Sequence, residues 1–195
     1  MSRPDPNEHN MRAFIAIKVA GEIRRRIIEI QNELKDINAD IRWVKSENIH
    51  ITLKFLGEVE DNRIIEVCRI VEDAVKTTGT FELSVETSGV FPGQGLPVVI
   101  WIGVSEGMEF LVKLYHSLEE SLYRAGFEKE KRNFSAHLTI GRISSARNIK
   151  NLLQKLETFK NVGLGRMAAE AVYILRSDLT PEGPVYSVIK KVELN

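Results

Sequence analysis

The stretch His50-Ile51-Thr52-Leu53 decides the fold, because the same pattern returns as His137-Leu138-Thr139-Ile140. The chain has four histidines, and two of them stand in this arrangement, with threonine two positions later and aliphatic neighbours. Successive side chains of a strand point to opposite faces. Each stretch would therefore present its histidine and threonine on one face and its aliphatic residues on the other. Two matched copies make a specific motif signal.

The two stretches lie 87 residues apart, and this spacing indicates an internal repeat. Both halves read as strand, helix, strand, helix and strand. A shift of 87 residues places Phe14 on Trp101, and the helix expected over 21–37 on the helix expected over 107–125. Side-chain identity between the halves is otherwise poor. We interpret the repeat as an ancient duplication, which predicts two similar lobes related by an approximate twofold axis.

Hydrophobic periodicity and turn residues predict the elements of each half. Strands are expected over 12–19, 50–58, 81–91, 99–104, 137–143, 167–175 and about 185–193, with a short extended piece over 40–45. Helices are expected over 21–37, 61–76, 107–125 and 147–160. Residues 1–10 contain two prolines and almost no aliphatic side chain, so we expect a flexible tail before a single two-lobed domain over 11–195.

The composition restricts the classes of function. There are 27 basic and 27 acidic residues, so no protein-wide positive field exists to hold a long nucleic-acid tract, and any nucleic acid must be bound locally. The single cysteine, Cys68, excludes an internal disulfide and a cysteine zinc cluster. No apolar run approaches the length of a membrane span. We expect a cytoplasmic monomer that does not contact a membrane.

The paired motif carries the chemistry. If the two histidine faces oppose each other, two imidazoles and two hydroxyl groups line one cleft, without a metal-ligand set or an activated nucleophile. This set suits phosphodiester transfer. One imidazole deprotonates the attacking water, the other protonates the departing ribose oxygen, and the threonines donate to nonbridging phosphate oxygens. The alternative, an amphipathic strand with a structural histidine, is less consistent with two matched copies.

Several further stretches, together with the two motifs, carry a resemblance to a known family. They are Met11–Ala16, Leu53–Glu58, Gly141-Arg142 and Gly183–Tyr186. Together they resemble the RNA 2′,3′-cyclic phosphodiesterase branch of the two-histidine phosphoesterase superfamily, also called 2′-5′ RNA ligases, from about residue 11 to the C-terminus. The resemblance implies an α+β fold with two pseudo-twofold-related lobes, antiparallel sheets with helices on their outer faces, and a central cleft.

The same resemblance implies an activity. RNA ends bearing a 2′,3′-cyclic phosphate would be opened to a 2′-phosphate without metal or cofactor, with possible reverse joining to a 2′-5′ linkage. By this resemblance, His50 would be the proton donor to the 3′ oxygen and His137 the proton acceptor from water, whereas Thr52 and Thr139 would hold the phosphate. The residues themselves leave the order of donor and acceptor open.

Weaker candidates for substrate binding surround the motifs. Arg142 is one residue out of phase with His137, so strict alternation turns it away from the cleft unless Gly141 permits a bulge. Lys54 is in phase with His50 and could contact phosphate, although a solvated lysine is an alternative.

Aromatic and basic side chains give further candidates. Phe55, Trp43 and Tyr186 could stack on a base, although a core or rim position suits each of them as well. Lys131 and Arg132 precede the second motif and could steer an RNA end towards it.

Two other functions stay open at this point. One is a noncatalytic protein that binds RNA ends in the same cleft without turnover. The other is an enzyme that makes or cleaves 2′-5′ links, acting on tRNA halves or oligoadenylate. Both intact motifs favour an enzyme, and neither motif identifies the RNA.

Overall fold

The computed structural model describes residues 10–194 as a sheet of nine strands with four α-helices. The strands are β1 (Asn10–Lys18), β2 (Ile41–Trp43), β3 (His50–Glu60), β4 (Phe81–Phe91), β5 (Val99–Val104), β6 (His137–Ile143), β7 (Gly163–Ala169), β8 (Ala171–Thr180) and β9 (Gly183–Glu193). The helices are α1 (Gly21–Lys35), α2 (Asp61–Val75), α3 (Met108–Arg124) and α4 (Ile149–Glu157), with a 3-10 turn at Ser46–Asn48.

All strand pairs are antiparallel, and they form one sheet in the order β7-β4-β5-β6-β3-β1-β8-β9, with β2 also paired to β6. The central neighbours β3 and β6 are joined by a single residue pair, Ile51 with Leu138. We therefore divide the sheet there into two lobes. Lobe one contains β2 and β4 to β7, and lobe two contains β1, β3, β8 and β9. The predicted antiparallel α+β architecture is confirmed.

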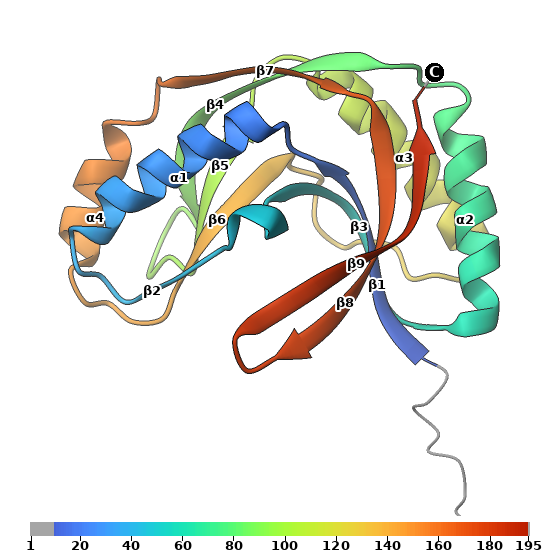
Figure 1. Cartoon of the computed structure of the whole chain (residues 1–195), viewed down its shortest axis with the longest axis horizontal. Coiled ribbons are helices and arrows are strands. Elements are labelled where there is room, and N and C mark those ends of the chain that lie inside the picture. The colour runs from blue at the N-terminus through green and yellow to red at the C-terminus, as the bar shows by residue number, and fades with distance from the viewer. Residues whose placement is uncertain (1–9, 195) are drawn as a thin grey trace, which may run out of the picture.

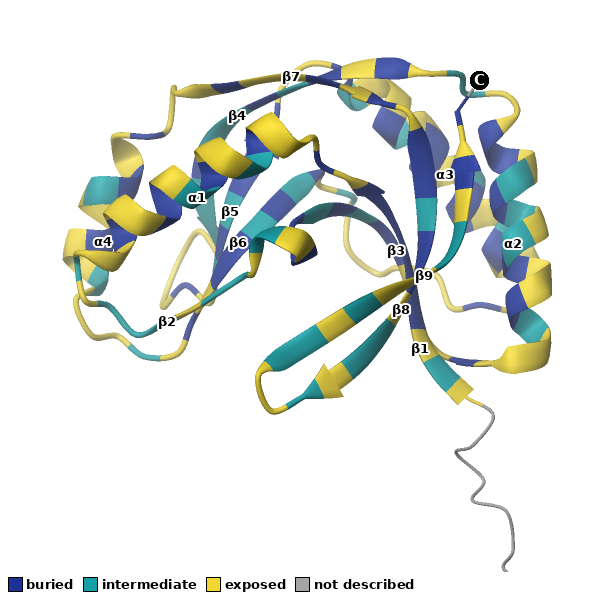
Figure 2. Cartoon of the chain, viewed as in Figure 1, coloured by how far each residue is buried: buried dark blue, intermediate teal, exposed yellow. Residues whose placement is uncertain are grey.

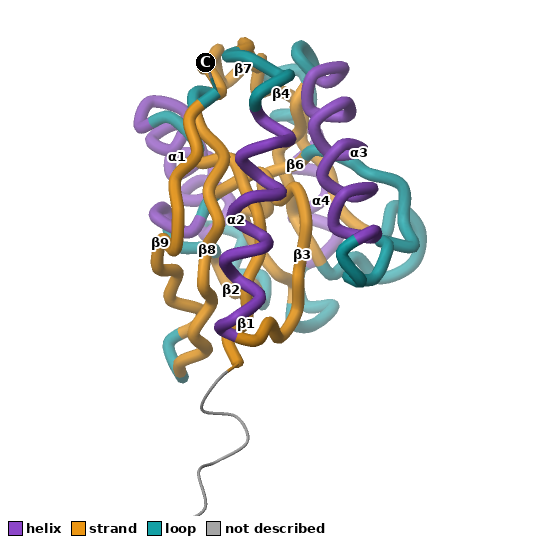
Figure 3. The backbone as a smooth tube through the Cα atoms, turned by 90° about the vertical axis from the view of Figure 1, so that its right-hand side faces the viewer, coloured by secondary structure: helices purple, strands orange, loops and turns teal. Residues whose placement is uncertain are grey.

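Each lobe carries two helices, and one of the two is exchanged. Helices α1 and α4 lie over lobe one, and α2 and α3 lie over lobe two (Figure 1). However, α1 follows β1 of lobe two, and α3 follows β5 of lobe one. The view in Figure 3 shows α2 running across the strands of lobe two. The exchange provides a further connection between the lobes besides the β3–β6 residue pair.

The main core lies between the sheet and the helices, and it contains the aliphatic residues of both motifs. Ile51, Leu53, Leu138 and Ile140 are buried there, and the helix faces turned towards the sheet are buried as well (Figure 2). The motif histidines and threonines are only partly buried. The predicted division of each motif strand into a core face and a polar face is therefore confirmed. We call the sheet face that carries the histidines and threonines the site face.

A smaller apolar cluster lies apart from the main core. It is formed by Phe14, Ala16 and Leu175, with Tyr173 and Tyr186 packed against it. These residues come from β1, β8 and β9, so this cluster gives lobe two a packed aromatic surface on the side of β1 that carries Phe14. This surface is where His50 is held.

One predicted strand is wrong. The sequence predicts one strand over 167–175, but the structure has β7 ending at Ala169 and β8 beginning at Ala171. β7 pairs with β4 at the edge of lobe one, whereas β8 pairs with β1 in lobe two. The chain thus crosses between lobes at Glu170, where no glycine or proline marks the break.

The predicted alignment of the repeat is also corrected. Trp101 pairs with Thr139, and the residue paired with Thr52 is Ala16. Trp101 therefore corresponds to Ala16, an offset of 85 residues, and not to Phe14. One constant shift cannot align the halves, because the segments that join the paired strands differ by two residues.

Two expectations concern the ends and the surroundings of the chain. The predicted tail over residues 1–10 lies outside the described residues except for Asn10, which is the first residue of β1. Among residues 10–194, none of the helices is long and apolar enough to span a membrane.

Candidate functional site

The two motifs meet at the centre of the sheet. In an antiparallel register, the residue before one partner lies across from the residue after the other. The pair of Ile51 with Leu138 therefore sets His50 across from Thr139 and Thr52 across from His137. The histidines become diagonal neighbours, about 7 to 8 Å apart at the backbone. Two imidazoles at this separation can contact one phosphate group held between them.

Both histidines are oriented by the same backbone contact. His50 Nδ1 lies 2.7 Å from the carbonyl oxygen of Asn48, and His137 Nδ1 lies 2.7 Å from that of Ser135. Because a carbonyl can only accept, each Nδ1 carries a hydrogen and donates it. In the neutral ring, Nε2 then holds the lone pair, and it is this atom that remains for proton transfer.

His50 lies in an aromatic pocket of lobe two. Its ring centre is 4.9 Å from that of Phe14 and 5.4 Å from that of Tyr186, which meets it edge-on. Burial lowers the pKa of His50 to about 4; the Asn48 carbonyl raises it in part, and the nearby His137 lowers it further. His50 is therefore neutral at pH 7 in the free protein.

The support of His50 is also tied to the C-terminal hairpin. The side chain of Asn48 is buried, and its Nδ2 donates to the carbonyl of Pro184 at 2.8 Å. Tyr186 follows two residues later in the same hairpin. Burial raises the pKa of Tyr186, while Arg142 and then Arg12 act in the opposite direction. Arg142 of lobe one is thus close to the His50 pocket of lobe two.

His137 is held by a different aromatic residue, Phe91. Phe91 meets it edge-on at 5.2 Å between ring centres and stacks on Trp101 at 5.1 Å. The indole of Trp101 fits only because Gly89 lies opposite: a Cβ there would come within 2.3 Å of Trp101 Cζ2. Sequence reasoning missed Phe91, since it placed that residue at the end of a strand beside a loop.

A bulge shared by both motif strands determines which side chains continue on the site face. Leu53 has no partner between the pairs of Thr52 and Lys54 on β1, and Ile140 has none between the pairs of Thr139 and Gly141 on β5. An extra residue reverses the alternation beyond it. Lys54 and Gly141 therefore turn towards the helices, and the next residue in each strand returns to the site face.

The prediction that Lys54 shares the face of His50 is wrong for this reason. Lys54 is buried, and its Nζ lies 2.9 Å from each carboxylate oxygen of Glu119 on α3. It also donates to the carbonyl of Glu128. Lys54 holds α3 against β3 and lies behind the sheet, where it cannot reach a phosphate between the two histidines.

Beyond the bulge, the side chains that return to the site face are Phe55 in β3 and Arg142 in β6. Phe55 is 63% exposed and its ring lies 6.1 Å from that of Phe14. Arg142 is exposed, at the corresponding place in β6. Arg142 reaches the site face because of the bulge at Ile140-Gly141. Each lobe therefore contributes one of these two side chains.

The remaining sequence candidates lie farther from the centre. Trp43 packs with the core beside Gly141, whose Cβ would come within 3.2 Å of the indole. Lys131 and Arg132 are exposed in the segment between α3 and β6, where their backbone amides donate to Glu130. No contact joins them to the histidines, so their steering role stays a prediction.

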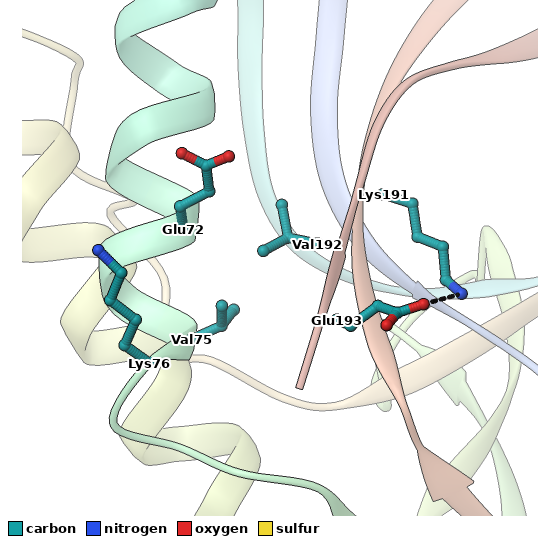
Figure 4. Close-up of a pocket in the computed structure, with 6 residues that line it drawn as sticks. All are labelled: Glu72, Val75, Lys76, Lys191, Val192 and Glu193. Carbon is teal, nitrogen blue, oxygen red and sulfur yellow. Dashed lines mark hydrogen bonds and ion pairs between the residues drawn. The ribbon is translucent and has the colours of Figure 1, made fainter. Parts of the chain in front are cut away.

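A shallow pocket lies elsewhere, between α2 and β9. It is lined by Glu72, Val75, Lys76, Lys191, Val192 and Glu193 (Figure 4). Its charges are balanced: Lys191 is paired with Glu193 at 2.9 Å, and Lys190 beside it is paired with Glu72. Within the part of the chain that the structure describes, His, Cys, Asp and Glu side chains do not gather in threes.

Comparison with known proteins gives a consistent result. The family model described as LigT like Phosphoesterase matches residues 17–101. An RNA 2′,3′-cyclic phosphodiesterase of Methanothermobacter thermautotrophicus is 36% identical over 177 residues, which cover 91% of this chain and 95% of that protein. One from Methanocaldococcus jannaschii is 35% identical over 181 residues, covering 93% and 99%.

Solved structures share the fold. Escherichia coli LigT, crystallised with 3′-AMP, matches with a TM-score of 0.79 and 24% identity, covering 95% of this chain and 99% of that one. A protein of Thermus thermophilus matches with a TM-score of 0.79 and 23% identity, covering 94% and 98%.

Proposed function

Since this chain belongs to the LigT-like phosphoesterase family of RNA 2′,3′-cyclic phosphodiesterases, we propose that it hydrolyses 2′,3′-cyclic phosphate ends of RNA to 2′-phosphomonoesters. One observation carries the proposal: the pairing of Ile51 with Leu138 brings two imidazoles and two threonine hydroxyls to one face. An RNA end offers a single strained phosphate that all four groups can contact together.

The chemistry follows from the free Nε2 atoms. Water attacks phosphorus, and Nε2 of His137 takes its proton as general base. The bond from phosphorus to the 3′ oxygen breaks, and protonated Nε2 of His50 donates to that oxygen. The phosphate remains on the 2′ oxygen. Thr52 and Thr139 donate to the nonbridging oxygens, where charge develops in the transition state.

The donor role of His50 requires proton uptake with substrate. In the free protein its pKa is about 4, so the ring is neutral at pH 7. A phosphodiester anion bound beside it favours the charged imidazolium and raises this pKa. Binding of the substrate phosphate would thus protonate His50, the residue that later donates the proton to the 3′ oxygen.

Side chains around the histidines would hold the rest of the RNA end. Arg142 lies near the His50 pocket and carries the charge to contact a phosphate of the RNA end. Phe55 is exposed beside Phe14 and offers a ring on which the terminal base can stack. Lys131 and Arg132 would attract the approaching strand from the edge of the site.

The finer parts of the proposal concern ligation and cellular context. In ligation, the 5′-hydroxyl of a second RNA would take the place of water. His137 would remove its proton as it attacks phosphorus, and His50 would protonate the departing 3′ oxygen, so that a 2′-5′ link forms. We infer that tRNA halves with 2′,3′-cyclic ends are suitable substrates, and that the protein acts as a cytoplasmic monomer. Its single cysteine is compatible with a reducing compartment.

A direct assay tests the proposal. A short RNA ending in a 2′,3′-cyclic phosphate is incubated with the protein and a chelator, and the product is compared with synthetic 2′- and 3′-phosphate standards. The proposal expects the 2′-phosphate alone. Saturable binding of the cyclic end without turnover would instead identify a noncatalytic end-binding protein. Comparison of cyclic, 2′-5′ and 3′-5′ linked substrates separates the related enzymes.

A further inference from the structure

We propose that Arg42, together with Arg142, forms a second phosphate subsite that binds the phosphodiester on the 5′ side of the terminal nucleotide. This inference rests on the proposed function. It extends the substrate from a cyclic phosphate to an RNA end of at least two nucleotides. Arg42 is not part of either motif.

The register of β2 places the two arginines directly opposite each other. Arg42 pairs with Arg142 in the antiparallel β2–β6 ladder. Backbone hydrogen bonds fix this register on both sides, from Val44 N to Ile140 O at 3.0 Å and from Ser144 N to Asp40 O at 2.8 Å. Directly paired residues point to the same face of a sheet, so Arg42 accompanies Arg142.

The neighbours of Arg42 show which face this is. Ile41 and Trp43 pack against the main core, and a Cβ on Gly141 would come within 2.9 Å of Ile41 and 3.2 Å of Trp43. Because side chains alternate along a strand, Arg42 must point the other way, to the site face. Arg42 and Arg142 are both exposed there.

The charges on this edge lack a partner. Like charges directly opposite each other destabilise a strand pair, and within residues 10–194 neither arginine takes part in an ion pair. The nearest acid along β2, Asp40, is already held by Arg147 at 2.6 Å and by the hydroxyl of Ser145. Two guanidinium groups arranged in this way suit a phosphate, which they can bind through bidentate hydrogen bonds.

The position of the pair identifies which phosphate it would bind. Along β6 from the centre of the sheet, the order is His137, Thr139 and Arg142. Arg42 lies beside Arg142 on the neighbouring strand β2, about 4.8 Å away. Arg142 is also near Tyr186 in the His50 pocket. With the cyclic phosphate between the histidines, the next anion in the RNA is the 5′ phosphodiester of the same nucleotide, and the arginines lie where the strand leaves the centre.

Three substrates of increasing length test the subsite. They are adenosine 2′,3′-cyclic phosphate, the same nucleotide with a 5′-phosphate, and the dinucleotide ApA ending in a 2′,3′-cyclic phosphate. We expect Arg42→Gln to raise KM about tenfold for the second and third substrates, with little change for the first. The matched control is Arg25→Gln, an exposed arginine on α1 without an ion pair to the described residues. It should leave all three KM values unchanged.

The outcomes separate this inference from the proposed function. If the wild-type protein opens the first substrate but Arg42→Gln does not alter the KM ratio between the first and the other two, the subsite is wrong and the proposed function stands. If no substrate is opened, binding of the dinucleotide product with a 2′-phosphate, measured by calorimetry, still tests Arg42. Equal affinity of wild type and Arg42→Gln would then overturn the inference.

Discussion

Ile51 and Leu138 occupy the same place in the two motifs, and they pair with each other across β3 and β6. This is the only described residue pair between these strands. A slip of one residue would turn every side chain of one strand to the opposite face. A single backbone register at the meeting point of the lobes therefore decides whether two histidines and two threonines can share one phosphate.

The stability of the protein should depend on the protonation of His50. Its folded pKa is about 4, against 6.5 for an unperturbed ring. Between these values the unfolded state binds more protons, so stability is complete above about pH 6.5 and falls as the pH is lowered towards 4. The full loss is about 3 kcal/mol. Urea unfolding at a series of pH values measures it.

The variant His50→Gln serves as the control for this effect. It should flatten the part of the stability profile that lies between pH 4 and 6.5. A wild-type profile that is flat across this window, or one that His50→Gln leaves unchanged, would contradict the burial of a neutral His50.

Lys54 should prove to be a structural residue. Lys54→Ala leaves Glu119 buried without its cation, and we expect a loss of about 3 to 5 kcal/mol in the free energy of unfolding. The double variant Lys54→Met/Glu119→Leu should recover most of this loss. At a temperature where the single variant is folded, KM for a cyclic-ended RNA should not change. A raised KM with normal stability would contradict this prediction and indicate that Lys54 contacts the phosphate.

Gly89 should be required as a glycine because of Trp101. In Gly89→Ala the new methyl group meets the indole, and displacing a packed ring costs about 1 to 3 kcal/mol. Since Trp101 pairs with Thr139, we also expect a lower kcat. Gly93→Ala is the control, because no atom lies within 4 Å of its Cβ position. Equal melting temperatures for both variants would argue against this packing.

Phe55 should act in binding and not in stability. Its ring is 63% exposed, so Phe55→Ala should change the free energy of unfolding by less than about 0.5 kcal/mol. Loss of a stacked base should weaken binding of the RNA end by about 1 to 3 kcal/mol. Ile65→Ala, an equally exposed apolar residue on α2, is the control. The same affinity in both variants would exclude stacking on Phe55.

The motif faces and most of the elements could be predicted from sequence, because burial imposes a period that local residues record. His50 and Thr52 were placed together in this way, opposite the buried Ile51 and Leu53. The orientation of Lys54 could not be predicted from sequence, since a bulge is a property of the pairing between two strands. The same limit applies to Trp101, whose place in the repeat depends on the register with Thr139.

The connections between the lobes could not be predicted from sequence either. The residues around Glu170 contain no turn signal, because the chain passes from β7 to β8 without turning back on itself. The exchange of α1 and α3 could not be predicted either, since amphipathic periodicity shows which face of a helix is buried but not which sheet it packs against. Phe91 could have been found only through its contact with His137, which joins residues far apart in the chain.

The central claim is that His50 and His137 act together on one phosphate. It is tested most directly by single-turnover rates of ring opening for the wild type, His50→Ala, His137→Ala and the double variant. We expect each single variant to lose about 10²- to 10⁴-fold, and the double variant to lose little more than either, because acid and base act as a unit. Full activity in either single variant would contradict the claim.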